Sequence, residues 1–361
     1  MCYLSVMRTI CNCSNHRTDG VWQEGNPLFD IFNRRYTGSK HKLCGWIDEI
    51  ISENCRGDSF FDVFAGTGVV TYTVLPRYRR VVMNDFLCSN EIIYKAFFMR
   101  GKYNPSLLDE YQQKFVTLSP TELPENYFSD NFGGKYFNAD DAVMIGHIRE
   151  QLEYDRCRLT EKEFSVLLAS LLYSADRCAN TVGHYDAYIK GKSIPSRFEF
   201  VLINPVDVFT EVEIHREDAN ELAGKISADV SYIDPPYNSR QYSRFYHVLE
   251  NLTKWEKPML FGAALKPLEE NMSDYCRIAA SERFADLIGK LDTGFIVVSY
   301  NNTYAPKSKS SRNKIELDFI LDTLTDRGHT KSFKKMHQYF NAGKTVLDGH
   351  KEYLFITQTE G

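Results

Sequence analysis

One run of four residues has the groups that methyl transfer to a planar amine would need: Asp234, Pro235, Pro236 and Tyr237. The prolines fix φ and remove two N–H donors, so they predict a rigid turn in which the Asp234 carboxylate and a proline carbonyl accept hydrogen bonds at one point. Two acceptors favour the pyramidal form of an amino group conjugated to a base ring, whose lone pair can then attack a methyl carbon. The Tyr237 ring can stack on a base removed from a duplex. A purely structural Pro-Pro turn is the alternative.

A glycine-containing turn is the second candidate site, and it comprises Asp62, Val63, Phe64, Ala65, Gly66, Thr67 and Gly68. Glycines directly after a buried strand let the backbone turn tightly and approach a ligand without interference from Cβ atoms. The third glycine of the dinucleotide fingerprint is missing, because no glycine occurs at the expected place after Gly68. A cofactor without a pyrophosphate therefore fits better than a nicotinamide dinucleotide.

Asp85 stands at the end of the next expected strand, about 20 residues beyond the glycine turn. A carboxylate at that place can accept hydrogen bonds from both ribose hydroxyls of an adenosyl group. The alternative is a surface carboxylate that caps the following helix.

The elements that would position these residues follow from hydrophobic patterning. We expect strands at 59–64, 79–84, 229–233 and 294–300, and a closing antiparallel pair at 345–347 and 352–357. Helices are expected at 42–51, 89–100, 160–178, around 287–291 and at 315–324. Thr160 and Glu163 predict a capping box for the third of these helices. Strand, glycine turn, helix, strand and acid, in this order, open a nucleotide-binding α/β sheet.

The alternation of expected strands and helices is interrupted between residues 101 and 215, where the chain is polar and rich in aromatic side chains. We interpret 101–215 as an inserted domain, and 29–100 together with 216–361 as the main domain. Residues 1–28 lack periodicity and are expected to form a poorly ordered N-terminal extension.

Composition indicates a protein of the cytoplasm. The 361 residues are 43% hydrophobic, and no apolar run approaches the roughly 20 residues of a membrane helix. The nine cysteines form no Cys-x-x-Cys pair, and Cys11, Cys13 and His16 are better explained as ordinary side chains than as a metal site, so no metal is expected. A net charge of −5 does not indicate a strongly basic nucleic-acid binder, although lysines and arginines cluster at 307–314 and 331–335.

These motifs, in this order, resemble those of the adenine-specific DNA methyltransferases in the alpha arrangement, where cofactor motifs precede the target-recognition region and the catalytic motif follows it. The resemblance covers most of residues 34–357. It implies a Rossmann-like S-adenosylmethionine-dependent methyltransferase fold, with a mixed seven-stranded sheet and a DNA-recognition domain inserted at 101–215. It also implies S-adenosyl-L-methionine as cofactor, and site-specific methylation of the N6 amino group of a flipped-out adenine in a restriction-modification or epigenetic role.

The resemblance assigns roles to individual residues. The segment from Arg35 to Lys40 resembles the N-terminal cofactor motif, with Lys40 near the methionine carboxylate. Glu217-Asp218-Ala219 resembles the acidic segment whose Asp lies near the cofactor adenine. Asp234 to Tyr237 matches the catalytic motif in full. The implied cofactor-binding set is Tyr36, Lys40, Asp62, Phe64, Ala65, Gly66, Thr67, Gly68, Asp85, Asp218, Ala219 and Asp234.

The implied partner is double-stranded DNA. The run from Asn238 to His247 resembles a branch that includes restriction-modification enzymes, which adds a cognate restriction endonuclease as a partner, a bacterial or phage-type cytoplasmic setting, and a monomer or homodimer without a membrane. Residues 299–302 resemble a later motif beside the target-base pocket. The insertion matches loosely and leaves the recognition sequence open. Candidate contacts to DNA are Asn180, His184, Lys190, Lys192, Asn238, Arg240, Gln241, Tyr242 and Arg244.

Other amines also suit the four-residue motif. The amino group of cytosine in DNA, guanine amines of ribosomal RNA and the amide of a protein glutamine are the alternatives for an enzyme. A DNA-binding protein that kept the fold without catalysis is the alternative of a different class. The insertion and the N-terminal motif favour adenine in DNA.

Overall fold

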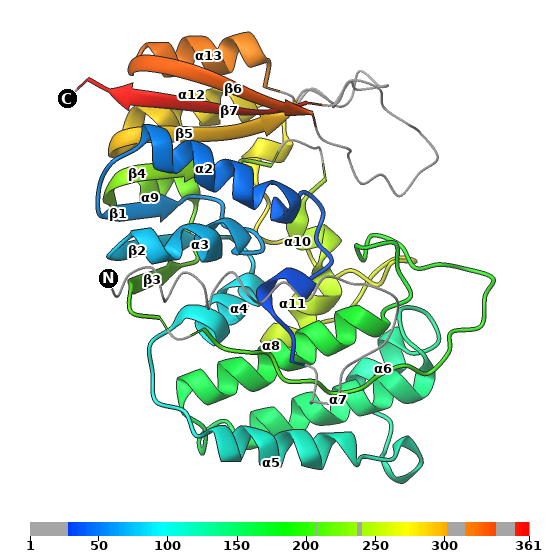
Figure 1. Cartoon of the computed structure of the whole chain (residues 1–361). Coiled ribbons are helices and arrows are strands. Elements are labelled where there is room, and N and C mark those ends of the chain that lie inside the picture. Colours follow the sequence, from blue (N-terminus) through cyan, green and yellow to red (C-terminus); the bar gives the residue numbers. More distant parts are fainter. Residues whose placement is uncertain (1–27, 207, 237–239, 302–314, 337–350, 361) are drawn as a thin grey trace.

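The computed structural model describes residues 28–206, 208–236, 240–301, 315–336 and 351–360. A sheet with covering helices forms the upper half of the molecule in Figure 1, and a group of helices forms the lower half. No helix among these residues is long and apolar enough to cross a membrane.

Seven strands form one mixed sheet, in the order β3-β2-β1-β4-β5-β7-β6. The five strands from β3 to β5 are parallel, and β7 runs antiparallel to both β5 and β6. This arrangement confirms the predicted mixed seven-stranded sheet. The strands are β1 (Ser59–Asp62), β2 (Arg80–Asn84), β3 (Glu211–His215), β4 (Ser227–Ile233), β5 (Asp292–Asn301), β6 (Gly328–Met336) and β7 (Lys351–Thr359).

Helices cover both faces of the sheet and build the lower half (Figure 1). The α-helices are α2 (Cys44–Asn54), α3 (Val69–Val74), α4 (Cys88–Phe98), α5 (Pro105–Val116), α6 (Tyr127–Phe132), α7 (Ala139–Tyr154), α8 (Glu161–Cys178), α9 (Ala219–Ala223), α10 (Tyr242–Phe245), α11 (His247–Lys254), α12 (Ala280–Lys290) and α13 (Leu317–Thr325). The 3-10 helices are η1 (Ile31–Asn33), η2 (His41–Leu43), η3 (Leu75–Arg77), η4 (Pro120–Glu122) and η5 (Asp274–Cys276).

Alternation along the strands divides the core into two layers. Successive strand side chains point to opposite faces, so Phe60 packs in one hydrophobic cluster and its neighbour Phe61 in the other. The first cluster includes buried residues of α2, α3 and α4, and the second includes those of α9, α12 and α13. Burial on both faces explains the apolar runs in β1, β2, β4 and β5, whereas the edge strand β3 is partly exposed and has charged residues.

The expected insertion is bounded differently in the structure. Its last residues, Glu211–His215, form β3 and pair with β2, so they are part of the sheet. The helical part also shares its core with the sheet, because one cluster runs from Phe60 through α4 to α7 and α8. Helix α8 begins with the predicted capping box of Thr160 and Glu163.

The closing strands differ from the prediction as well. β7 forms as expected, but in the described part of the chain its partners are β5 and β6. Strand β6 was not predicted from the sequence, because its residues are mostly exposed and show no apolar run. Residues 345–347, the expected partner, lie outside the described residues.

Candidate active site

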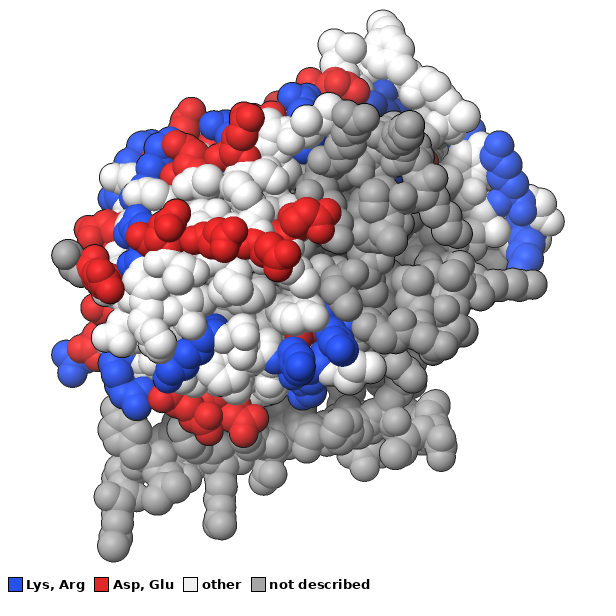
Figure 2. Space-filling model, turned by 90° about the horizontal axis from the view of Figure 1, so that it is seen from above, with Lys and Arg blue, Asp and Glu red and all other residues white. Residues whose placement is uncertain are grey.

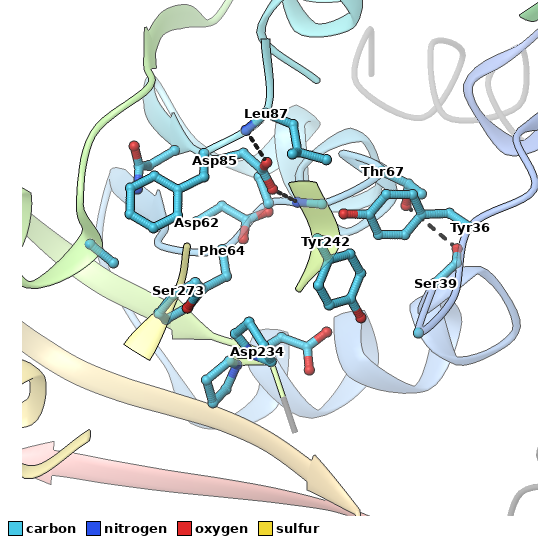
Figure 3. A pocket seen from close by; sticks show the side chains of 18 of the residues that line it. Tyr36, Ser39, Asp62, Phe64, Thr67, Asp85, Leu87, Asp234, Tyr242 and Ser273 are labelled. Carbon is cyan, nitrogen blue, oxygen red and sulfur yellow. Dashed lines mark hydrogen bonds between the residues drawn. The ribbon is translucent and has the colours of Figure 1, made fainter. Parts of the chain in front are cut away.

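A cavity opens where β1, β2 and β4 end, at the edge of the sheet where open α/β folds place their ligands. Figure 3 shows Asp62, Asp85 and Asp234 around it, with Tyr36 and Tyr242 on another side. Expected site residues that line the cavity are Tyr36, Lys40, Asp62, Phe64, Ala65, Gly66, Thr67, Asp85, Ala219, Asp234, Pro235, Pro236, Gln241 and Tyr242. Segments far apart in the sequence thus contribute to one site.

The glycine turn forms one wall of the cavity. Gly66 and Gly68 both have positive φ values, of 54° and 75°, which residues other than glycine rarely adopt. A Cβ atom on Gly68 would also lie 3.3 Å from Ile31, Met83 and Tyr94. Gly68 therefore lies outside the cavity lining but allows the turn to pack closely against the core. The Tyr94 hydroxyl donates a hydrogen bond of 2.7 Å to the Gly66 carbonyl and fixes the turn from below.

Asp85 holds the glycine turn and faces the cavity at once. Its carboxylate accepts hydrogen bonds from the backbone N–H groups of Gly66, at 3.1 Å, and Leu87, at 2.9 Å. Burial raises the pKa of Asp85 to about 6, although these hydrogen bonds lower it. The carboxylate thus lines the cavity and orders the turn that leads into α4, whose N-cap residue makes no side-chain capping hydrogen bond.

Asp62 is more deeply buried than Asp85, and only one of its carboxylate oxygens has a hydrogen-bond partner among the described residues. One carboxylate oxygen accepts a hydrogen bond of 2.7 Å from the Thr71 hydroxyl, and the other has no hydrogen-bond partner among the described residues. Burial raises the pKa of Asp62 to about 7. A buried acceptor without a partner at a cavity wall is suited to a ligand that brings a donor or a positive charge.

Asp234 follows the last residue of β4 and lies beside a buried ammonium group. The Lys40 Nζ atom is 3.0 Å from Asp234 Oδ1 and 2.8 Å from Glu352 Oε1. Burial raises the pKa of Asp234 to about 6, Lys40 lowers it and Glu352 raises it. The sequence analysis placed Lys40 near a cofactor carboxylate. In the structure its nearest acidic partners are these two protein carboxylates.

Stacked tyrosines form the aromatic side of the cavity. Tyr36 stacks on Tyr246, with ring centroids 4.7 Å apart and planes 6° apart, and on Tyr242, with centroids 5.3 Å apart. The Tyr242 hydroxyl donates to the Thr37 carbonyl, and the Tyr246 hydroxyl accepts from the Thr37 N–H. The segment after η1 is therefore held against α10 and α11, which fixes Tyr36 at the cavity.

Several expected site residues have internal roles instead. Asp218 caps α9 by accepting from the N–H groups of Asn220 and Glu221. The Gln241 amide exchanges two hydrogen bonds with the backbone of Ser273, so this cavity-lining residue also braces the following loop. The Arg244 guanidinium donates 2.7 Å to the Pro267 carbonyl.

The expected DNA contacts of the insertion divide into two groups. The Asn180 side chain donates to the carbonyls of Lys135 and Ile189, so it orders its own loop. His184 stacks on Phe245 with centroids 4.5 Å apart, and burial lowers its pKa. Lys190 and Lys192, in contrast, are exposed.

Arg240 is also exposed and lies next to an acidic residue of the insertion. Its Nη1 atom is 3.5 Å from a carboxylate oxygen of Asp186, which also pairs with Lys266. The expected residues Tyr237 and Asn238 lie outside the described residues, as does the basic cluster at 307–314.

Charge is mixed on the face seen from above, over α13. Figure 2 shows bands of Asp and Glu between groups of Lys and Arg, with residues that are not described covering part of the view. The described lysines and arginines of this face thus do not form one continuous basic surface.

The structure adds site residues that the sequence analysis missed. Glu352 lies on a correctly predicted strand, and its acidic side chain at the start of an apolar run was the available signal. Asn271 and Ser273 line the cavity from a loop that has no recognisable pattern. Among the described residues, no group of His, Cys, Asp and Glu side chains is arranged to hold a metal ion.

Comparisons with known proteins agree with this geometry. The family model of the D12 class N6 adenine-specific DNA methyltransferases matches residues 36–312. The type II methyltransferase M.CviAII of Paramecium bursaria Chlorella virus 1 is 30% identical over 346 residues, which cover 90% of this chain and 98% of that protein. The type II methyltransferase M.NlaIII of Neisseria lactamica is 31% identical over 344 residues, which cover 90% of this chain and 98% of that protein. The type II methyltransferase M.FokI of Planomicrobium okeanokoites is 32% identical over 350 residues, but this chain spans only 53% of its length.

Proposed function

Because the chain belongs to the D12 class of N6 adenine-specific DNA methyltransferases, we propose that its methyl donor is S-adenosyl-L-methionine and that the target adenine is flipped out of DNA to reach Asp234. One observation carries the proposal: Asp234, followed by two prolines, shares a single cavity with the glycine turn and Asp85. The amine acceptor and the predicted cofactor loop thus belong to one site.

The chemistry of the cavity fits this cofactor. A sulfonium and an α-ammonium group are both cations, and the cavity has the carboxylates of Asp62, Asp85 and Asp234 on its walls. The partner-less oxygen of Asp62 is an acceptor suited to the ammonium group, and Asp85 is placed to accept from ribose hydroxyls. The cofactor-binding set we propose is Tyr36, Lys40, Asp62, Phe64, Ala65, Gly66, Thr67, Asp85 and Ala219.

The hydrogen-bond acceptors at Asp234 and the following prolines are suited to bind the amino group of the target base. When bound, the cofactor supplies a methyl group on a positively charged sulfur. Asp234 and a carbonyl of the following prolines hold the two amine hydrogens, so that the nitrogen lone pair faces the methyl carbon. In that arrangement an N–C bond would form as the C–S bond breaks, the sulfur would keep the C–S electron pair, and the amine would lose one proton to the Asp234 carboxylate. Placement and electrostatics supply most of the rate in such a step.

DNA would enter along the helical half. The exposed side chains of Lys190, Lys192 and Arg240 are suited to phosphate groups, which fix the position of a duplex without reading its sequence. We assign target recognition to residues 101–210. The relatives named as type II methyltransferases also support a restriction-modification role with a cognate endonuclease.

Transfer of a labelled methyl group from S-adenosyl-L-methionine to genomic DNA tests the proposal. We expect label in N6-methyladenine after enzymatic digestion to nucleosides, and a loss of at least about 10³-fold in rate for Asp234→Ala. Asp322→Ala, which removes an exposed carboxylate from α13, is the matched control and should keep the wild-type rate.

Two results would contradict the proposal. Label in N4-methylcytosine or in RNA alone would overturn the substrate. A wild-type rate for Asp234→Ala would overturn the catalytic assignment.

A further inference from the structure

Glu352 is a buried carboxylate that the proposed reaction does not yet use. It lies on β7 opposite Asn301 of β5, and its side chain is 3% exposed. One of its oxygens accepts a hydrogen bond of 3.0 Å from the Ser299 hydroxyl and lies 2.8 Å from Lys40 Nζ. The same ammonium nitrogen is 3.0 Å from Asp234, so Lys40 joins a carboxylate on β7 to the one after β4.

Among the described residues, this cluster contains two carboxylates and one ammonium group. Two carboxylates share the charge of Lys40, and all three groups are largely removed from water. A buried charge that lacks full compensation is costly, and replacement of such a cluster by apolar residues often stabilises a protein. Stability therefore gives no account of Glu352, and the excess carboxylate lies within one ammonium group of the proposed catalytic residue.

We propose that Glu352 is a positioning residue that acts through Lys40 to orient the Asp234 carboxylate and to keep it a strong proton acceptor. The proposal rests on the proposed role of Asp234. Glu352 fixes the ammonium nitrogen at one place, and Ser299 fixes Glu352 in turn. By drawing part of the Lys40 charge to itself, Glu352 leaves Asp234 more basic than a simple ion pair would, which suits a group that accepts hydrogens from an amine losing a proton.

The proposal predicts how the rate depends on pH. The groups that face Asp234 are Lys40 from the segment before η2, Glu352 from β7, Asp62 from β1 and Tyr232 from β4. The Asp234 carboxylate takes up a proton as the pH falls through about 6, so activity should fall there. Without the negative charge of Glu352, Asp234 stays ionised to lower pH.

The experiment compares pH–rate profiles of wild type, Glu352→Gln and Glu352→Asp with saturating cofactor and DNA. For Glu352→Gln we expect the maximal rate to fall about tenfold and the acidic limb to move down by about one pH unit, with the KM for DNA unchanged. Glu352→Asp keeps the charge and shortens the reach, so it should lower the rate but leave the acidic limb in place. Thr357→Val, an equally buried change on β7 whose wild-type hydroxyl bonds Thr330, is the control and should change neither quantity.

The outcomes separate this proposal from the proposed function. If Asp234→Ala is inactive but Glu352→Gln keeps both the wild-type rate and the wild-type acidic limb, Glu352 has no positioning role. A lower rate with an unmoved limb in Glu352→Gln would also overturn the proposal, because it indicates a structural role alone. If Glu352→Gln does not fold, a limb that shifts in Glu352→Asp would contradict the proposal.

Discussion

The strand-end cavity and the loop after α8 were both expected to carry functional residues, and they differ in what those residues do. At the cavity, Asp62, Asp85 and Asp234 line one space as the sequence pattern predicted. In the loop, Asn180 donates to backbone carbonyls and the half-buried His184 stacks on Phe245, while Lys190 remains exposed.

The difference comes from how each region places its side chains. Parallel strands bring their carboxyl ends to one edge, so a residue just after a strand reaches that edge whatever the rest of the chain does. A polar residue in a long loop can satisfy its own backbone or face solvent, and only the packed structure decides between them. Substitutions in the two regions test this contrast.

Asp62→Asn should stabilise the fold and weaken cofactor binding. The pKa of Asp62 is raised to about 7, whereas an unfolded chain has an Asp pKa of about 4. Between these values the folded carboxyl holds a proton that the unfolded one has lost, so wild type loses stability as the pH rises toward and through 7. At pH 8 the variant should be more stable by an amount on the order of a few kcal/mol, and at pH 5 by less.

Urea unfolding at the two pH values and calorimetric titration with S-adenosyl-L-methionine check this prediction. Affinity should fall about tenfold or more, because a neutral amide cannot balance a cation. Asp58→Asn, an exposed change just before β1, is the control. A variant that gains stability equally at both pH values would show that Asp62 is ionised in the fold throughout.

Asn180→Ala should behave as a structural variant, despite the position of Asn180 among the expected DNA contacts. Loss of its two hydrogen bonds to backbone carbonyls should lower the free energy of unfolding by about 1–3 kcal/mol. Chemical denaturation measures this loss. If the variant keeps wild-type stability but loses DNA affinity, Asn180 belongs with the contact residues and the contrast fails.

Lys190→Ala and Lys192→Ala should change DNA affinity and leave stability unchanged, the opposite of Asn180→Ala. The change in binding free energy should be smaller than the loss of stability in Asn180→Ala. Each should weaken DNA binding severalfold and reduce the slope of log affinity against log salt by about 1, without a change in melting temperature. Fluorescence anisotropy at several salt concentrations measures both. An unchanged salt slope would mean that DNA does not pass over this loop.

Sequence patterns predicted five of the seven strands of the sheet and most of the cavity wall. Apolar runs predicted β1, β2, β4, β5 and β7. The candidate residues at the ends of β1, β2 and β4 were identified because the carboxyl ends of parallel strands lie at one edge of the sheet. The glycine turn could also be predicted from local sequence, because a backbone with positive φ values at Gly66 and Gly68 requires glycine.

Which charges lie in contact depends on the tertiary structure. Lys40, Asp234 and Glu352 are separated by long stretches of chain, and their contact depends on the order of β4, β5 and β7 in the sheet. Likewise, the exposed strand β6 and the shared core of the insertion have no periodic signal of their own. An apolar run shows that Glu352 belongs to a buried strand, whereas its contact with Lys40 is set by long-range packing and could not be predicted from the sequence.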